Sequence, residues 1–541
     1  MNRYLDEKKE LAIIPRPVSV KLEGCHFVLN KETKILYDEK NEENAEYLGS
    51  ILRLSTGYPL YFRKLKRKSS MDNTIKLITD KDSEGFDREG YQIKISSDQI
   101  KLTALNTHGL FYAIQTLRQL FPKQIEGKNI IEDIQWKIPC AEIKDYPRFR
   151  WRGFMLDEAR YFWGKAVVKR FLDIMALLKM NIFHWHLTDD QGWRIEIKKY
   201  PKLTQVGSKR KKTNLGGVIV FKSDDKPHEG YYTQEDIKEI VKYAEKLYIK
   251  IIPEIDMPGH TMALLASYPE YSCTGGPFEV PHQFRGLYKD VLCPGNENLY
   301  EFIKNILDEI MEIFPSDILH IGGDEVPKSR WKQCKKCQAQ ISEEKLKDER
   351  ALQIYFMNRI IDYLKKNEHT AIVWNDILSD ELNKNALIQH WMNRRKQNLE
   401  ELSKNRKFIM SNFFNVYLNY NYIVTPLKKT YNYEPIPEKI KSSFKPNFIG
   451  IEGALWTQWF LDFYNLQIYT FPRLFAIAET GWTQKKRKNY KSFESRLKRF
   501  NKRLDVMKIN YRSLNKSNPY FLKRLSMPFH ILLGSKNFKK N

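Results

Sequence analysis

Between residues 153 and 478, short apolar runs alternate with segments of helical periodicity, and this rhythm constrains the fold more than any other feature. Eight runs have strand length, at 153–156, 182–187, 249–255, 318–321, 371–374, 387–391, 408–411 and 448–455. The clearest helical segments are 166–179, 234–247, 299–314 and 351–365, and the stretch 464–478 follows the last run. Eight strands, mostly followed by helices, predict an α/β fold of the (β/α)8 TIM-barrel type. The second half fits less well, because no strong helix separates 387 from 408.

A different pattern precedes this region. Residues 91–105 alternate apolar and polar side chains around a turn, which predicts a hairpin, and 108–121 have helical periodicity. Pro147 then breaks the structure ahead of a new apolar run. We therefore predict a small α+β domain over residues 1–145, the barrel over 146–500, and a basic C-terminal helix and tail over 501–541.

The charge balance raises the question of a nucleic-acid partner. The 541 residues carry 91 basic and 66 acidic side chains, for a net charge of +25. The densest basic runs, 63–68, 209–212 and 485–488, lie in no recognisable nucleic-acid module. A solvated basic surface is the favoured interpretation, and we expect no nucleic-acid partner.

We expect no export signal in the N-terminal segment as given. Its longest apolar run, 11–14, is far shorter than the core of a signal peptide, and no run is long enough to span a bilayer. We expect a soluble chain without a membrane span, cytoplasmic as given, or extracytoplasmic if a leader was removed. The oligomeric state is not predicted.

The six cysteines are too few for the disulfide framework of a small secreted protein. Cys334 and Cys337 form one CxxC pair, whereas a structural zinc site usually has four ligands. Cys273 and Cys293 would complete such a set or pair as a disulfide. Free thiols are the favoured interpretation of these cysteines, and we predict no metal.

Residues capable of chemistry lie at the end of every apolar run or just beyond it, where barrel enzymes place their active sites. Acids, histidines and an arginine follow the first four runs, and aromatic or amide side chains follow the last four. They are Asp157, Arg160, His184, His186, Asp189, Asp190, Glu254, Asp256, His260, Asp324, Glu325, Trp374, Trp391, Tyr417, Asn419, Trp456 and Gln458. This coincidence predicts an enzyme active site at one end of the barrel.

Three motifs carry a family resemblance. "HWHLTDDQGWR", "PEIDMPGH" and "HIGGDE" follow one another along the chain, and they resemble the β-N-acetylhexosaminidases of glycoside hydrolase family 20. "HGLFYAIQTLRQL" is similar to the end of the small α+β domain that precedes the barrel in that family. The resemblance implies a carbohydrate substrate with a terminal N-acetylhexosamine and no cofactor.

The resemblance also implies a mechanism in which the substrate supplies the nucleophile, an exception to the two-carboxylate scheme of most glycosidases. The 2-acetamido carbonyl attacks C1 and forms an oxazolinium ion. Glu325 would be the general acid and then the base, Asp324 would orient and stabilise the acetamido group, and Tyr417 would bind its oxygen. Gly322 and Gly323 permit a backbone turn that lets both neighbouring acids reach one sugar.

The remaining matches are to residues that surround the sugar. Trp374, Trp391 and Trp456 would be aromatic walls, Arg160 would hold hydroxyl groups, and Asp189 and His260 would support the acid. Other interpretations stay open. A place in the core is the alternative for Trp374 and Trp391, although their position at strand ends favours pocket walls. For Arg160 the alternative is an ion pair with Asp157 at the rim. For His184 and His186, structural hydrogen bonding is favoured over metal binding.

Two positions depart from the family pattern. Asn419 and Gln458 stand where the family commonly has an Asp and a Glu that bind the far hydroxyls of the sugar. Weaker sugar binding is the simplest consequence. A carboxylate would repel a 6-O-sulfate whereas an amide would not, so altered specificity for 6-O-substituted N-acetylglucosamine is an alternative. A carbohydrate-binding barrel without activity is another.

Overall fold

The computed structural model describes residues 10–66, 72–80, 88–214, 223–282, 287–392 and 399–520. The chain divides into two compact units, of which the first comprises 1–152, 174–180 and 471–517 and the second comprises 153–173, 181–470 and 518–541. Helix α16 (Tyr490–Val506) continues through the predicted boundary at residue 500. The domain limits predicted from sequence stay a prediction.

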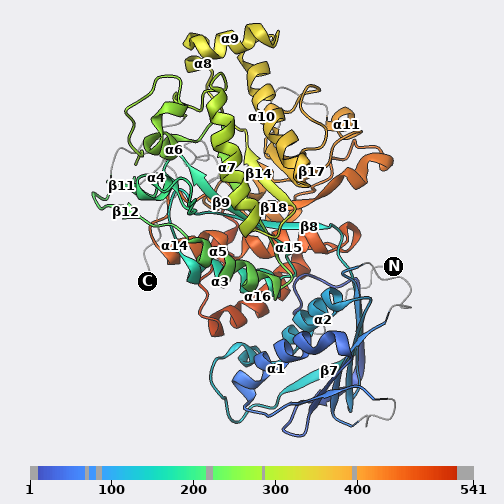
Figure 1. The fold of residues 1–541 in the computed structure, drawn as a ribbon. Coiled ribbons are helices and arrows are strands. Elements are labelled where there is room, and N and C mark those ends of the chain that lie inside the picture. Colours follow the sequence, from blue (N-terminus) through green and yellow to red (C-terminus); the bar gives the residue numbers. More distant parts are fainter. Residues whose placement is uncertain are drawn as a thin grey trace. The chain divides into compact units, whose positions relative to one another are not determined.

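A seven-stranded mixed sheet forms the body of the first unit. In sheet order its strands are β1 (Ser19–Val28), β7 (Lys137–Asp145), β5 (Tyr91–Ile95), β6 (Gln99–Ala104), β4 (Thr74–Thr79), β2 (Lys34–Tyr37) and β3 (Tyr61–Lys64). Helices α1 (Glu42–Thr56) and α2 (Thr107–Leu120) lie side by side against the sheet (Figure 1). The antiparallel pairing of β5 with β6 confirms the predicted hairpin, and α2 confirms the helix after it.

One disulfide bond, which the cysteine count did not predict, joins two strands of this sheet. Cys25 of β1 is bonded to Cys140 of β7. The two strands pair antiparallel, and the register of β1 is interrupted between Leu22 and His26, beside Cys25. The pairing therefore brings together two cysteines that are 115 residues apart in sequence.

The second unit contains a closed barrel of eight parallel strands, which confirms the predicted fold. In barrel order the strands are β8 (Trp151–Asp157), β9 (Ile182–Asp189), β13 (Lys250–Met257), β14 (Ile318–Gly322), β15 (Thr370–Trp374), β16 (Leu387–His390), β17 (Phe408–Met410) and β18 (Phe448–Leu455). The pairing of β8 with β9 closes the barrel. Each predicted apolar run overlaps one strand.

Helices between the strands begin where their sequences provide caps. The predicted helical segments correspond to α3 (Lys165–Leu177), α5 (Gln234–Glu245), α7 (Glu297–Ile313) and α10 (Glu349–Lys366). Thr233 and Asp236 form a capping box at the start of α5, and Asp348 accepts two backbone hydrogen bonds at the start of α10. These caps satisfy amide groups that have no partner within the helix.

The barrel departs from regularity in its second half, as predicted. Between β16 and β17 the described residues form only the short helix α11 (Leu399–Leu402). The stretch 464–478 is divided between α14 (Phe463–Thr470) and α15 (Arg473–Trp482). Pro472 explains this break, because proline lacks an amide hydrogen and clashes with the preceding turn. No helix among the described residues is long and apolar enough to cross a membrane.

Candidate active site

A sharp backbone turn at the end of β14 brings two neighbouring acids to one site. Gly322, Gly323 and Glu325 have positive φ angles of 66°, 96° and 49°. A Cβ atom at position 322 would overlap the Asp256 carboxylate, so glycine is required there. His260 Nε2 lies 3.7 Å from Asp324 Oδ2 and 4.0 Å from Glu325 Oε2. Both carboxylates therefore face the same imidazole, although neighbours on a regular strand point to opposite sides.

The two acids differ in their surroundings. Asp324 Oδ1 is buried and accepts no hydrogen bond from any residue that the structure describes. Burial raises the pKa of Asp324 to about 7; the His260 cation opposes this shift, and the charges of Asp376 and Glu325 add to it. The Glu325 side chain is 27% exposed. One acid is thus held in the protein with an open acceptor atom, and the other meets solvent.

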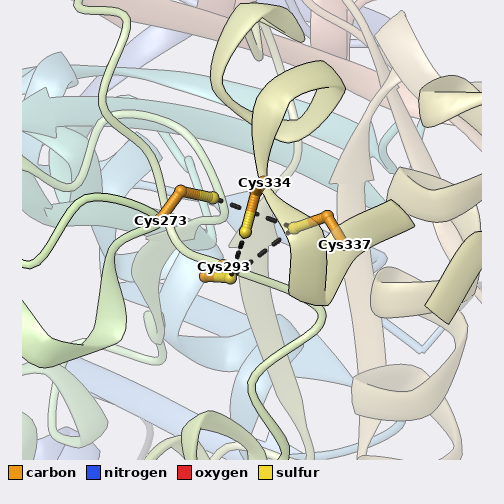
Figure 2. A group of neighbouring side chains, drawn as sticks. All are labelled: Cys273, Cys293, Cys334 and Cys337. Carbon is orange, nitrogen blue, oxygen red and sulfur yellow. Dashed lines mark hydrogen bonds between the residues drawn. The ribbon is translucent and has the colours of Figure 1, made fainter. Parts of the chain in front are cut away.

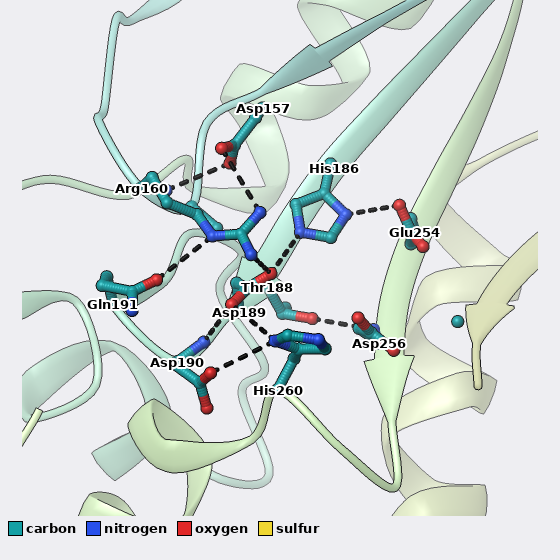
Figure 3. A network of polar contacts seen from close by, with 12 residues as sticks. Asp157, Arg160, His186, Thr188, Asp189, Asp190, Gln191, Glu254, Asp256 and His260 are labelled. Carbon is teal, nitrogen blue, oxygen red and sulfur yellow. Dashed lines mark hydrogen bonds and ion pairs between the residues drawn. The ribbon is translucent and has the colours of Figure 1, made fainter. Parts of the chain in front are cut away.

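His260 connects these acids to a buried ionic network. Figure 3 shows this network around Asp189 and Arg160. Its Nδ1 atom lies 3.3 Å from Asp189 and 3.2 Å from Asp190. Although burial opposes protonation, the charge of Asp189 and the hydrogen bonds to both aspartates hold the pKa of His260 well above its ordinary value. Arg160 forms a 2.6 Å ion pair with Asp189. The site therefore contains an imidazolium between two sets of carboxylates.

Arg160 is more than a partner of Asp157 at the rim. It is buried, its Nη1 atom lies 3.5 Å from Asp157, and its Nε atom donates to Gln191 at 3.1 Å. Its guanidinium also lies 4.9 Å from the ring centre of Trp456. Arg160 thus joins the ionic network to the aromatic side chain of Trp456.

Glu254, inside the barrel, holds the histidines of β9 and β14. Its carboxylate lies 3.0 Å from His184 Nε2 and 2.8 Å from His320 Nδ1, and it also bonds His186. His184 contacts Glu452 as well, at 2.7 Å, and these carboxylates outweigh burial and raise its pKa to about 9. The structure therefore shows the hydrogen-bonding role that was favoured for His184 and His186.

Three tryptophans gather around Tyr417. Its ring stacks on Trp391 with the centroids 6.2 Å apart, and it lies 6.2 Å from Trp456, which in turn is 6.0 Å from Trp374. Trp374 and Trp391 are buried, and Trp374 donates to Glu254 at 2.8 Å. Trp456 is partly exposed. The two buried indoles serve the core, and the assignment of all three as sugar walls stays a prediction.

Asp376, which was not predicted, links the aromatic group to the acids. Its carboxylate accepts a hydrogen bond from the Glu325 amide at 3.4 Å and another from Trp391 Nε1 at 2.7 Å. Asp376 lies two residues after Trp374, the last residue of β15, in the sequence "WND". The expectation that chemistry lies just beyond each strand would have identified it.

The two amides that depart from the family pattern lie in the segments that follow the neighbouring strands β17 and β18. Asn419 is buried, and it follows Tyr417, whose backbone pairs with Ala454 of β18. Thr457 hydrogen-bonds Asp157 and so fixes the segment that carries Gln458. Gln458 Oε1 is buried and has no hydrogen-bond partner among the described residues. A ligand hydroxyl would satisfy this buried acceptor.

Several side-chain groups have the composition of metal sites. The acid–histidine groups around Glu254, Asp189 and Asp256 place ligand-type atoms within 4.8 Å of one another, and so do Cys273, Cys293, Cys334 and Cys337. In the acid–histidine groups, the ion pairs described above already balance the charges of Glu254 and Asp189. The four cysteines have no comparable explanation.

Comparisons with known proteins agree with this geometry. Residues 149–485 match the catalytic domain of glycosyl hydrolase family 20, and residues 10–146 match domain 2 of that family. The β-hexosaminidase of Porphyromonas gingivalis is 35% identical over 518 residues, which cover 93% of this chain and 64% of the relative. The chain thus spans less than two thirds of that relative.

Solved structures share the whole fold. The β-N-acetylhexosaminidase of Streptomyces coelicolor A3(2) superposes with a TM-score of 0.80 at 28% identity, covering 94% of this chain and 99% of that one. The exo-β-N-acetylglucosaminidase of Vibrio harveyi, in complex with N-acetylglucosamine, gives a TM-score of 0.80 at 28% identity, with 93% and 78% covered. From the barrel, the paired acids and these matches we conclude that the chain belongs to glycosyl hydrolase family 20 and contains the catalytic domain of that family.

Proposed function

We propose that the protein is an exo-acting, retaining β-N-acetylhexosaminidase that uses substrate-assisted catalysis. The observation that carries this proposal is the pair of adjacent acids at one imidazole, with one buried open oxygen on Asp324 and a solvent-exposed side chain on Glu325. A cyclising acetamido substrate requires these two properties. It needs an anion beside the amide nitrogen and a proton donor that reaches the leaving oxygen.

The reaction then proceeds in two steps. Glu325 donates its proton to the glycosidic oxygen, the bond from this oxygen to C1 breaks, and the acetamido oxygen bonds to C1. Asp324 accepts a hydrogen bond from the acetamido nitrogen, and Tyr417 donates one to the oxygen. In the second step, the Glu325 carboxylate takes a proton from water, the water oxygen attacks C1, and the ring opens. Two displacements at C1 retain its configuration.

The environment of Asp324 suits the developing charge. Without a ligand, burial and nearby acids disfavour its ionised form, which the raised pKa reflects. The oxazolinium would bring a second positive charge to this carboxylate, in addition to that of His260. Asp324 would therefore stabilise the developing oxazolinium more than the bound substrate. Stronger stabilisation of the transition state than of the ground state is the condition for a catalytic effect. Accurate placement of the acetamido group accounts for much of the remaining acceleration.

The surrounding residues would hold the sugar. Trp456 is partly exposed and lies beside Arg160, so it offers an aromatic face next to a hydrogen-bond donor. Asp189 and His260 would keep Arg160 and the two acids in place through their ion pairs. Trp374 and Trp391 would support this wall from the buried side.

A chromogenic assay tests the proposal. We expect the protein to release nitrophenol from an aryl β-N-acetylhexosaminide, with either the gluco or the galacto sugar. A thiazoline analogue of the cyclic intermediate should inhibit competitively and bind more tightly than N-acetylglucosamine. Binding of the sugar without any release would instead indicate the non-catalytic carbohydrate-binding barrel.

The amides Asn419 and Gln458 support a narrower proposal about the substrate. Both replace acids of the family pattern, and Gln458 has a buried oxygen without a partner among the described residues. A site without these negative charges would tolerate a 6-O-sulfate on N-acetylglucosamine. The ratio of kcat/KM on plain and 6-sulfated aryl glycosides tests this specificity, and a strong preference for the plain sugar would exclude it.

A further inference from the structure

Four cysteines that play no part in the proposed reaction converge from three segments of the second unit (Figure 2). Cys273 follows the turn η3 (Pro269–Tyr271), and Cys293 precedes α7. Cys334 precedes α9 (Lys335–Glu343), and Cys337 lies in its first turn. The sulfur of Cys337 is 3.8 Å from that of Cys273 and 3.5 Å from that of Cys293, and the sulfurs of Cys293 and Cys334 are 3.7 Å apart.

These distances match a metal site better than disulfide bonds. All four sulfur atoms lie within 4.8 Å of one another. In a disulfide the two sulfurs are about 2.05 Å apart. A tetrahedral site with Zn–S bonds of about 2.3 Å places its sulfurs about 3.8 Å apart. The observed separations agree with the second arrangement, in which every sulfur has three neighbours.

The backbone holds the four residues in this arrangement. Ser272 and Leu292 form an antiparallel bridge, so Cys273 and Cys293, each one residue further along, lie diagonally on the same face of the paired segments. A Cβ atom at position 295 would clash with the backbone carbonyl of Lys336, so Gly295 lets the segment of Cys293 approach the CxxC pair closely. The convergence therefore depends on local features of two separate loops.

The surroundings suit thiolates that are shielded from solvent. Cys293 and Cys337 are buried, and they pack with Val291, Trp331 and Leu352. A structural metal site of this kind is closed to solvent, as this cluster largely is.

We propose that Cys273, Cys293, Cys334 and Cys337 bind one zinc ion as four thiolates in a closed, structural site. Each thiol loses its proton on binding, and no electron is transferred. The site would tie the loop between β13 and α7, which carries His260, to the segment after β14, which carries both catalytic acids. Val326 packs against the cysteine cluster and follows Glu325 directly. The zinc would therefore fix the positions of the two loops relative to each other without touching the substrate.

Metal content gives a test that is independent of activity. The protein purified from zinc-containing medium should carry one zinc per chain by mass spectrometry, and four thiols should become reactive after denaturation with a chelator. The double variant Cys293→Ser/Cys337→Ser should lose the zinc. The matched control Cys25→Ser/Cys140→Ser removes two cysteines from the first unit and should keep one zinc per chain.

A cobalt spectrum of the unmodified chain covers the case in which the cysteine variant does not fold. Replacement of zinc by Co²⁺ should give the intense thiolate charge-transfer and d–d bands of a tetrahedral site. Four reactive thiols with no zinc bound in excess metal would overturn the proposal. So would two disulfides, seen as an absence of reactive thiols in these four cysteines, or one iron per chain instead of zinc. Removal of zinc should lower the melting temperature of the chain.

Discussion

Two buried aspartates, one in each unit, show how the same side chain serves stability in one place and chemistry in the other. Asp145 in the first unit is fully buried, and both of its oxygens are occupied. Its partners are Lys179 Nζ at 2.8 Å, the Tyr91 hydroxyl at 2.6 Å, Trp482 Nε1 at 2.9 Å and the Val18 amide at 3.1 Å. Asp324 in the second unit has a buried oxygen without a partner among the described residues and a raised pKa.

Burial alone therefore does not distinguish the two roles. A buried carboxylate destabilises the fold unless hydrogen bonds and a cation compensate for the lost water. Asp145 has this compensation within the protein. Asp324 lacks part of it, which indicates that a ligand supplies the missing partner. The following predictions test this contrast.

The largest effect is expected for Glu325→Gln. The variant cannot donate or accept the proton, so kcat/KM should fall by about 10²–10⁴-fold. The loss should be greatest on a glycoside with a poor leaving group, because nitrophenolate departs with little assistance. Steady-state rates on both kinds of substrate measure this difference. An equal and small loss on both substrates would contradict the role of Glu325.

The next largest effects are expected when the same Asp→Asn substitution is made at each of the two buried aspartates. Asp324→Asn should lower kcat/KM by about 10²–10³-fold, because the anion that stabilises the acetamido nitrogen is lost. Asp145→Asn leaves the Lys179 charge buried without its counterion, so it should reduce the free energy of unfolding by about 3–5 kcal/mol. Steady-state rates and urea unfolding, each measured on both variants, reveal the two effects.

The two variants should have different defects: Asp324→Asn should lose activity, and Asp145→Asn should lose stability. At neutral pH and above, we expect Asp324→Asn to unfold at a urea concentration no lower than the parent protein does. A large stability loss in Asp324→Asn without a rate defect would mean that its open oxygen has no catalytic purpose.

The pH dependence of kcat/KM and of the free energy of unfolding also tests the role of Asp324, with smaller expected effects. The free enzyme needs ionised Asp324, whose pKa is about 7, so kcat/KM should fall as the pH drops below 7. The folded state also holds this proton more tightly than the unfolded state, whose value is near 3.8. Protonated Asp324 therefore stabilises the folded state at low pH, and this contribution is lost as the pH rises from about 4 to about 7. The free energy of unfolding, measured with urea at several pH values, should therefore depend less on pH in Asp324→Asn than in the parent protein. An unchanged dependence on pH would contradict the raised pKa.

The smallest effect concerns the far end of the sugar. Gln458→Glu restores the acid of the family pattern and adds a charge-assisted hydrogen bond worth about 1 kcal/mol. It should improve kcat/KM on the plain glycoside by about fivefold and reduce it on the 6-sulfated one. Gln458→Asn serves as a neutral control. An equal change on both substrates would show that this position does not contact the 6-substituent.

The fold and much of the site follow from patterns that are local in sequence. Apolar runs of strand length located all eight barrel strands, because a buried parallel strand leaves an uninterrupted apolar signal. The same rule placed Arg160, His260 and Glu325 at one end of the barrel, and the structure joins them through ion pairs.

What escaped prediction depends on contacts between distant segments. The bond between Cys25 and Cys140 requires the register of β1 against β7, which no local pattern contains. The sequence offered a set of four cysteines only as a disfavoured alternative, because their convergence depends on contacts between the segment before α7 and the start of α9. Glu452 looked like part of an apolar run, and only the barrel interior reveals it as the partner of His184.

The central claim is that the acetamido group of the substrate is the nucleophile and that Asp324 stabilises the charge it develops. Successive fluorination of the acetyl methyl group weakens this nucleophile while the leaving group and sugar stay the same. Across the acetyl, fluoroacetyl, difluoroacetyl and trifluoroacetyl glycosides, log(kcat/KM) should fall steeply with each fluorine. A flat series, which an enzyme carboxylate nucleophile would give, would contradict the account.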